Sequence, residues 1–512
     1  MDLVRAVRAA PTRACCPARC LACRSAILIA TKGGGCVTHT CKGLEEWPRL
    51  NGTEVPAAAR TVLRVLEAAG LEAWLVGGWV RDALRGAPCH DVDLCCSGTW
   101  EQSERALEGA GIRVIESGIK FGGITAVVGE EHIEVTTYRL DGFYRDGRHP
   151  ESVQYASHVE DDLARRDFTV NAMAWHPERG LLDLYGGADD LQQGVIRAVG
   201  EPRRRFEEDA LRMLRAVRFA CRLNFTIEPK TAEALAACAP LLDAIARERV
   251  GIELDGILAT GRAGDALLRY PEVMCAAIPE LAACRGFEQH SRYHAFDVYD
   301  HTAHVLAEAG SVALRGEDAA PCAPSAALMW AALLHDIGKP GTFTLDQDGN
   351  GHFYGHPERG CAMAKRIMHR LALPADLVRD ACLLIRFHDR PLRPRRTDLL
   401  HMLNLLSRGG ADAPRLVELL FDLKRADTLG KAPSCFYYVQ DIEAMRLQTR
   451  ELVAAGEAYD NRTLALGGRD IIASGVAPGP RVGELLTSAL DAVMDGKATN
   501  DTASLLAYLG LG

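Results

Sequence analysis

Two aspartates separated by one residue are the feature of this sequence best suited to chemistry. Asp91 and Asp93 alternate with the apolar Val92 and Leu94. In an extended strand this alternation places both carboxylates on one face. A turn at Gly77-Gly78 precedes them, and its backbone N–H groups could approach a phosphate closely because no Cβ intervenes. Paired carboxylates beside such a turn suit Mg²⁺, which prefers oxygen ligands and shares its shell with substrate phosphates.

A strand and a short helix must position these groups. Leu75 and Val76 predict the end of a buried strand, and residues 80–86 predict a helix. This helix carries Arg81 near its N-terminus, where the helix dipole would favour the same anion. Alone, the glycine pair would be an ordinary turn and the Asp-x-Asp pair a solvated strand end. Their order and close spacing favour a catalytic site.

The motifs GGxVRD and DxD, in this order, resemble the first motif of the class II tRNA nucleotidyltransferase and bacterial poly(A) polymerase family. The resemblance implies an α+β nucleotidyltransferase head with a mixed β-sheet and helices, followed by all-α domains. It implies that Asp91 and Asp93 are catalytic and bind Mg²⁺. It also implies that Gly78 and Arg81 bind the nucleotide.

A β-hairpin is predicted after this motif, with strands at 124–128 and 133–138 around Gly129. Glu134 would lie on the face opposite the apolar residues of its strand. It could be a third carboxylate near the metal, and a surface glutamate is an equal alternative. Residues 141–151 predict a mobile loop. In the family, a loop at this place is associated with switching from CTP to ATP, while an ordinary connector is the alternative.

Residues 165–174, RRDFTVNAMA, resemble the second motif of the family. An arginine pair suits bidentate phosphate contact, and Asp167 could hold one arginine in place. The resemblance assigns nucleotide binding to Arg166, and Asn171 is a candidate ribose contact. Residues 186–191 resemble the third motif, which we interpret as a structural turn.

Residues 206–223 predict a single amphipathic helix. Four of its charged residues recur every three positions and would line one flank: Asp209, Arg212, Arg215 and Arg218. The run resembles the family's EDxxRxxRxxRF motif, which implies that the first two read the Watson–Crick edge of the incoming base. A carboxylate and a guanidinium can accept cytosine and adenine, which share an exocyclic amine, and reject uracil and guanine. The other two arginines would face triphosphate or RNA; a solvated arginine face is the alternative.

A second constellation lies in the helical C-terminal half. Its candidate metal ligands are His301, His335, Asp336 and Asp427, with His356 and His388 as further candidates. The set resembles the HD-domain superfamily of metal-dependent phosphohydrolases. This implies a divalent transition metal with open positions for water and phosphate. His304 is expected to lie beside the site or in the core rather than to be a ligand.

Composition limits the other possibilities. The 512 residues include 48% hydrophobic and 25% charged residues, as is ordinary for a soluble globular protein. The net charge of −9 excludes a generally basic protein, so nucleic acid must be contacted through local clusters such as 203–205 and 390–396. No apolar run approaches about 18 residues, so we expect no transmembrane helix.

The number and the surroundings of the cysteines indicate the redox state of the cellular compartment. The chain has 17, many within apolar runs, which favours a reducing cytoplasm over a disulfide framework. Residues 1–54 are rich in Cys and Arg, and we expect a poorly ordered extension there. A zinc site on the Cys20-x-x-Cys23 spacing is an alternative, although a matching second pair is lacking, and a transit peptide is another.

Five segments are therefore expected: an extension (1–54), a nucleotidyltransferase head (55–195), a helical neck and body for base reading and RNA binding (196–285), an HD domain (286–440) and a helical tRNA-binding tail (441–512). The whole resembles a CCA-adding tRNA nucleotidyltransferase with an appended HD domain. This implies cytoplasmic, template-independent addition of CCA to tRNA from CTP and ATP, with pyrophosphate released. Neither membrane nor DNA is an expected partner.

Three alternatives remain open. A bacterial poly(A) polymerase, or a relative that adds only CC or A, would share the head. A phosphohydrolase would use the HD site as its main activity. A non-catalytic RNA-binding protein would not require the carboxylate pair together with the base-reading pair.

Overall fold

The computed structural model describes residues 54–88, 91–117, 119, 122–140, 154–312 and 323–512, and the backbone of two paired strands, β1 (Ala26–Ala30) and β2 (Cys36–Thr40). The candidate zinc cysteines and the predicted loop at 141–151 lie outside the described residues. The chain divides into two compact units. The head unit comprises residues 1–139, 155–164 and 171–188, and the helical unit comprises 140–154, 165–170 and 189–512.

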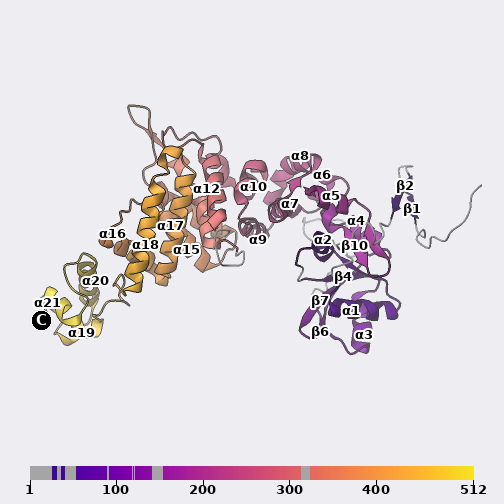
Figure 1. Ribbon diagram of the computed structural model, residues 1–512, viewed down its shortest axis with the longest axis horizontal. Helices are drawn as coiled ribbons and strands as arrows, with labels where there is room; N and C mark the ends of the chain where they lie inside the picture. Colours follow the sequence, from indigo (N-terminus) through magenta and orange to yellow (C-terminus); the bar gives the residue numbers. More distant parts are fainter. Residues whose placement is uncertain are drawn as a thin grey trace, which may run out of the picture. The chain divides into compact units, whose positions relative to one another are not determined.

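A seven-stranded mixed sheet forms the centre of the head unit (Figure 1), with the strand order β11-β10-β3-β4-β7-β6-β5. The strands are β3 (Ala73–Val76), β4 (Asp93–Cys96), β5 (Arg113–Ile115), β6 (Gly123–Val128), β7 (Glu131–Thr137), β10 (Met173–His176) and β11 (Gly180–Asp183). The β4–β7 pair is parallel, and the other pairs in this sheet are antiparallel. The predicted mixed-sheet head and the β6–β7 hairpin are confirmed.

Helices cover this sheet. They are α1 (Ala57–Ala68), α2 (Gly78–Arg85), α3 (Trp100–Gly109) and α4 (Val159–Ala164). The buried Val62, Leu63 and Leu66 of α1 pack towards the sheet, and Gly70 follows the helix with a φ of +79°. A capping box between Thr99 and Gln102 starts α3. Short strands β8 (Arg139–Leu140) and β9 (Gln154–Tyr155) flank residues 141–153.

The helical unit begins with a compact set of short elements. They are α5 (Gly187–Gln193, which starts at the unit boundary), β12 (Val195–Ile196), α6 (Pro202–Glu208), α7 (Leu211–Leu223), β13 (Thr226–Ile227), α8 (Pro229–Cys238), α9 (Arg247–Leu258), α10 (Ala263–Arg269) and α11 (Pro271–Ala277). The predicted single helix at 206–223 is wrong, because the chain leaves the helix at Asp209 (φ −146°, ψ 104°). The Asp209 side chain accepts a hydrogen bond from the Leu211 N–H, which favours a helix restart over continuation.

Ten further α-helices form most of the remainder of the described part of this unit (Figure 1). They are α12 (Val298–Val312), α13 (Ala326–Leu334), α14 (His356–Arg370), α15 (Ala375–Phe387), α16 (Arg396–Leu406), α17 (Ala413–Leu429), α18 (Tyr438–Ala454), α19 (Gly468–Ala473), α20 (Pro480–Met494) and α21 (Thr502–Tyr508). Helix α13 is buried nearly all round, and α12, α15 and α17 pack on it. The predicted boundary at 440 falls inside α18, which packs on α16 and α17.

Helix α9 lies between the first and the later helices. On one side it packs on α7. On the other, Gly251 lies so close to α14 that an added Cβ would collide with the Leu371 carbonyl oxygen. The Trp330 indole N–H also donates to Asp255 Oδ1 over 3.0 Å. Within the described ranges, every helix is too short or too polar to span a lipid bilayer.

Candidate functional site

Three carboxylates are associated with the start of β4 in the head unit. Val92 and Leu94 are buried, Asp91 is exposed and Asp93 is half-buried, as the alternation predicts. However, β4 begins at Asp93, so Asp91 precedes the strand instead of belonging to it. Glu134 on β7 is the lateral partner of Asp93 and is exposed. Lateral partners on neighbouring strands share a face, so the sheet brings these two carboxylates together. Such an oxygen donor set fits Mg²⁺.

The glycine turn lies between β3 and α2, as predicted. Gly77 adopts a φ of +70°, which a residue with a Cβ rarely adopts, and α2 begins at Gly78. Arg81 is only 3% exposed. Its Nη1 donates to Asn171 Oδ1 over 2.8 Å, and its Nε and Nη2 donate to the Asp82 carboxylate over 2.8 and 2.7 Å. These contacts tie α2 to the residues that lead into β10, so Arg81 fixes the shape of the turn.

The base-reading candidates lie at the start of α7 in the helical unit. Asp209 Oδ1 accepts from the Leu211 N–H (3.0 Å), and Oδ2 accepts from Arg249 Nη2 of α9 (3.2 Å). Arg212 is 9% exposed and donates to Glu208 Oε2 (2.9 Å) and to the Arg165 carbonyl (3.1 Å). The Arg212 contact joins α7 to the chain segment of the second motif.

The other two arginines of α7 form ion pairs. Asp167, expected to steady a neighbouring arginine, pairs with Arg215, whose Nε and Nη2 lie 2.9 and 2.8 Å from Asp167 Oδ2. Arg218 Nε donates to Glu253 Oε2 of α9 over 2.6 Å. Both guanidinium groups lie over the Phe219 ring, 5.5 and 4.9 Å from its centroid. Their contact with triphosphate or RNA stays a prediction, as does the role of the half-buried Arg166.

The HD-type residues converge in the helical unit although they come from distant segments. They are His301 on α12, His335 and Asp336 after α13, His356 at the start of α14, His388 after α15 and Asp427 on α17. All are buried. His304 stacks on Phe296 with ring centroids 4.1 Å apart and is in neither metal-capable group that the described residues form.

Asp336 is shared by two potential metal-binding groups. Its Oδ2 lies 3.2 Å from His335 Nε2 and 3.5 Å from His301 Nε2. Its Oδ1 lies 3.4 Å from His356 Nε2 and 3.6 Å from His388 Nε2. The ligand atoms within each group lie close enough together to hold one ion.

The orientation of the four histidines favours metal binding. Each places Nδ1 within 2.7–3.1 Å of a backbone carbonyl, of Gly430, Ala332, Phe353 or Ile385. Because a carbonyl can only accept, Nδ1 carries the proton in the neutral ring, and the Nε2 lone pair is directed towards Asp336. Asp336 Oδ2 forms an ion pair with Lys339 over 2.7 Å, and among the described residues no donor makes a well-aligned hydrogen bond to either Asp336 oxygen. A cation between the imidazoles and the carboxylate would accept electron pairs from the Nε2 atoms and from the Asp336 oxygens.

The pKa values of two carboxyl groups in this site are well below their usual values. Burial raises the pKa of Asp336, but the protonated form of His335 and the ammonium of Lys339 outweigh burial and hold that pKa well below its usual value. Burial also raises the pKa of Asp427, but Lys431 and His301 outweigh burial and hold that pKa well below its usual value. Both carboxylates are therefore ionised near neutral pH, as metal ligands must be.

Three residues of this site were missed by sequence reasoning. A cavity of about 290 Å³ opens onto Asp336 and is also lined by His294, Lys339 and Lys431. Lys339 Nζ lies 2.7 Å from Asp336 Oδ2, and Lys431 Nζ lies 2.7 Å from Asp427 Oδ2. The available sequence signal was the helical spacing: Lys339 follows Asp336 by three residues, and Lys431 follows Asp427 by four. Burial, and then Lys339, lowers the pKa of His294 to about 3.

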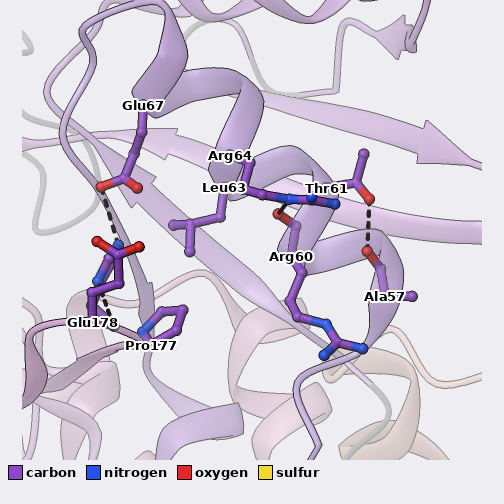
Figure 2. A pocket seen from close by; sticks show the side chains of 9 residues that line it. Ala57, Arg60, Thr61, Leu63, Arg64, Glu67, Pro177 and Glu178 are labelled. Atoms are coloured by element: carbon purple, nitrogen blue, oxygen red, sulfur yellow. Dashed lines mark hydrogen bonds and ion pairs between the residues drawn. The ribbon is translucent and has the colours of Figure 1, made fainter.

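A separate cavity of about 400 Å³ lies on the head unit between α1 and the turn that joins β10 to β11 (Figure 2). The buried His176 accepts a hydrogen bond from the Glu178 N–H at Nδ1, and its Nε2 lies 3.1 Å from Glu67 Oε1. The cavity is lined by both basic and acidic side chains, and none of the predicted site residues lines it.

Three domain families match the chain. Residues 73–197 match the poly A polymerase head domain, and residues 298–431 match the HD domain. Residues 224–284 match a probable RNA- and SrmB-binding site of polymerase A. The first two matches contain the carboxylate motif and the histidine cluster, respectively.

Curated relatives are CCA-adding enzymes. The enzyme from Streptococcus gordonii is 44% identical over 200 residues, which are 39% of this chain and 49% of the relative. The chain thus spans about half the length of this relative. The enzyme from Lactobacillus delbrueckii subsp. bulgaricus is 30% identical over 464 residues, which are 90% of this chain and 98% of the relative.

Solved structures of CCA-adding enzymes are similar to this chain. A Bacillus stearothermophilus CCA-adding enzyme in complex with CTP aligns with a TM-score of 0.65 and 27% identity, over 88% of this chain and 96% of that one. A Thermotoga maritima CCA-adding enzyme complexed with tRNA shares the fold, with a TM-score of 0.55 and 20% identity over 91% and 98% of the chains. Together with the near full-length Lactobacillus match, these similarities show that the chain belongs to the CCA-adding enzyme family.

Proposed function

We propose that this chain adds the CCA 3′ end to tRNA, with CTP and ATP as substrates and pyrophosphate as product. The observation that carries this proposal is the 30% identity to a CCA-adding enzyme across 98% of that relative's length. The carboxylates at β4 and the glycine turn before α2 supply the chemistry that such a reaction needs. The reaction belongs in the cytoplasm, where we expect the chain to act.

The transfer is an in-line attack by the tRNA 3′-hydroxyl on the α-phosphate of the nucleotide. Asp91 and Asp93, with Glu134 beside them, would hold Mg²⁺. When bound, Mg²⁺ lowers the pKa of the attacking hydroxyl and neutralises charge that develops at the phosphate. The backbone at Gly78 would approach the triphosphate, and Arg81 keeps that turn in shape.

Base selection is assigned to Asp209 and Arg212. Asp209 is held by the Leu211 N–H and by Arg249, each through a different oxygen. Each oxygen has a second lone pair that can accept from the exocyclic amine of cytosine or adenine. The neighbouring Arg212 would donate to the ring nitrogen or carbonyl. We assign tRNA contacts to the helical neck at 196–285 and the tail at 441–512.

One incorporation assay tests this function. A tRNA that lacks its 3′ end is incubated with CTP, ATP or both. Addition of two cytidines with CTP and completion to CCA with both nucleotides is the expected result. An open-ended adenosine tail would identify a poly(A) polymerase instead. Asp93→Ala should abolish incorporation, whereas Glu131→Ala, an exposed residue on the same sheet, should not.

A second activity is favoured by the histidine cluster around Asp336. We propose that it is a metal-dependent phosphohydrolase centre, in which His301, His335, Asp336 and Asp427 would hold one ion and Asp336, His356 and His388 would hold a second. When bound, the metal supplies an activated water and charge stabilisation at the phosphate. Lys339 and Lys431 would bind the phosphate oxygens of the ester.

Metal content tests this centre independently of activity. The purified protein should contain up to two transition-metal ions per chain by elemental analysis, and Asp336→Ala should contain none. Asp380→Ala, which alters another buried aspartate of the same helices, should keep its metal. Asp336→Ala should also retain nucleotide incorporation while losing hydrolysis of a generic phosphodiester. Equal metal content in both variants would contradict the assignment.

A further inference from the structure

Two cysteines on neighbouring helices of the helical unit lie next to each other. Cys361 is on α14 and Cys382 is on α15, and these two helices pack along their lengths. The Cys382 Sγ lies 3.8 Å from the Cys361 carbonyl oxygen, so the Cys382 thiol lies against Cys361 where the two helices pack. Both residues are half-buried, so small oxidants can reach them.

The environment of the pair makes the two sulfurs unequal. The hydrogen bond from Cys382, together with the charges of Arg386 and Lys365, outweighs burial and lowers the pKa of Cys361 to about 7. The same hydrogen bond, and burial, raise the pKa of Cys382. A thiolate is the reactive form of cysteine, so Cys361 is the nucleophile of the pair.

We propose that Cys361 and Cys382 are a redox-active dithiol that hydrogen peroxide closes into a disulfide between α14 and α15. The Cys361 thiolate attacks one peroxide oxygen, the O–O bond breaks, and a sulfenic acid and a hydroxide ion result. The Cys382 sulfur then attacks the sulfenic sulfur. The S–S bond forms as the S–O bond breaks, and the oxygen leaves as water with the thiol proton. Two electrons pass to the peroxide, and a dithiol reductant reverses the bridge by exchange.

The bridge would join the two helices close to the histidine cluster. Helix α14 begins at His356, and His388 directly follows α15. Cys361 and Cys382 lie only one to two turns from these histidines along their helices. Closing the bridge therefore fixes the spacing of the two helices that present His356 and His388. It should also raise the unfolding temperature of the helical unit by several degrees, because it restricts a loop of about 20 residues in the unfolded chain.

Mass spectrometry of the full-length protein tests this proposal. The reduced protein is treated with equimolar hydrogen peroxide, its remaining thiols are alkylated, and its peptides are mapped. Most of the Cys361 and Cys382 should appear in one cross-linked peptide that dithiothreitol releases. Cys435→Ser, which alters another half-buried thiol, should leave this cross-link unchanged.

Two single variants separate the nucleophile from its partner. In Cys382→Ser, a dimedone label should trap sulfenic acid at Cys361. In Cys361→Ser, the same peroxide dose should leave Cys382 unlabelled. Nucleotide incorporation confirms that each variant is folded, because neither cysteine belongs to that machinery. Full alkylation of both thiols after peroxide treatment, or cross-links to other cysteines in their place, would overturn the proposal.

Discussion

Arg81→Met is the substitution that most directly tests how the head unit forms its glycine turn. The change removes the bonds from the guanidinium to Asn171 and to both Asp82 oxygens. Arg81 is 4% exposed at its side chain and Asp82 is 16% exposed, so water replaces few of these contacts. Removing a hydrogen bond that involves a charged group costs about 1.5–3 kcal/mol. With Asn171 and Asp82 both affected, we expect a loss of about 2–5 kcal/mol in the free energy of unfolding.

Urea unfolding followed by tryptophan fluorescence measures this loss, because Trp74, Trp79 and Trp175 all lie in the head unit. Arg85→Met is the matched control. Its guanidinium lies 3.8 Å from Asp82 and its side chain is 34% exposed, so we expect less than about 1 kcal/mol. Arg81→Lys keeps the charge but cannot bind both partners. Its free energy of unfolding should therefore be nearer to that of Arg81→Met than to that of the wild type. The reasoning fails if Arg81→Met is no more destabilising than Arg85→Met.

Three further outcomes are expected. Asp209→Asn should reduce the preference for CTP over UTP, measured as the ratio of kcat/KM values, by about ten- to a hundred-fold; an unchanged ratio would remove this residue from base reading. Burial lowers the pKa of His176 below its unfolded value. Its contribution to head stability should thus be complete above about pH 6.5 and be lost as the pH falls through the lower folded pKa. His176→Gln should flatten that part of the stability–pH curve. Gly251→Ala should destabilise the helical unit by about 1–3 kcal/mol because its Cβ meets the Leu371 carbonyl, whereas Gly483→Ala on α20, with open space around it, should be neutral or stabilising.

The head could be predicted largely from local patterns. The alternation around Asp93 gave the correct buried and exposed faces, and the hairpin followed from the turn at Gly129. The lateral pairing of Asp93 with Glu134 depends on which strands are neighbours. Strand order is a tertiary property, so the sequence pattern left two equal alternatives for Glu134.

The errors have tertiary causes. The helix break at Asp209 involves a local cap and a contact from Arg249, which lies 40 residues away. Periodicity detects neither, because both are hydrogen bonds of the Asp209 side chain and leave the spacing of the apolar residues unchanged. Asp167 pairs with Arg215, 48 residues away, and the local sequence pattern does not indicate this partner. In the histidine cluster, residue types indicated the ligands, but His294 has no sequence motif and only the cavity identifies it.

Helix α9 has a consequence for how this protein could be shortened. The same helix that holds Asp209 and Arg218 through Arg249 and Glu253 also lies against α14 and α13 through its opposite side. A truncated chain that ended at residue 285 would uncover that side and leave Asp209 and Arg212, the proposed base-reading residues, beside a helix that has lost part of its packing. Helices α13 and α14 thus support α9, and their removal should impair the proposed base selection as well as the proposed hydrolysis.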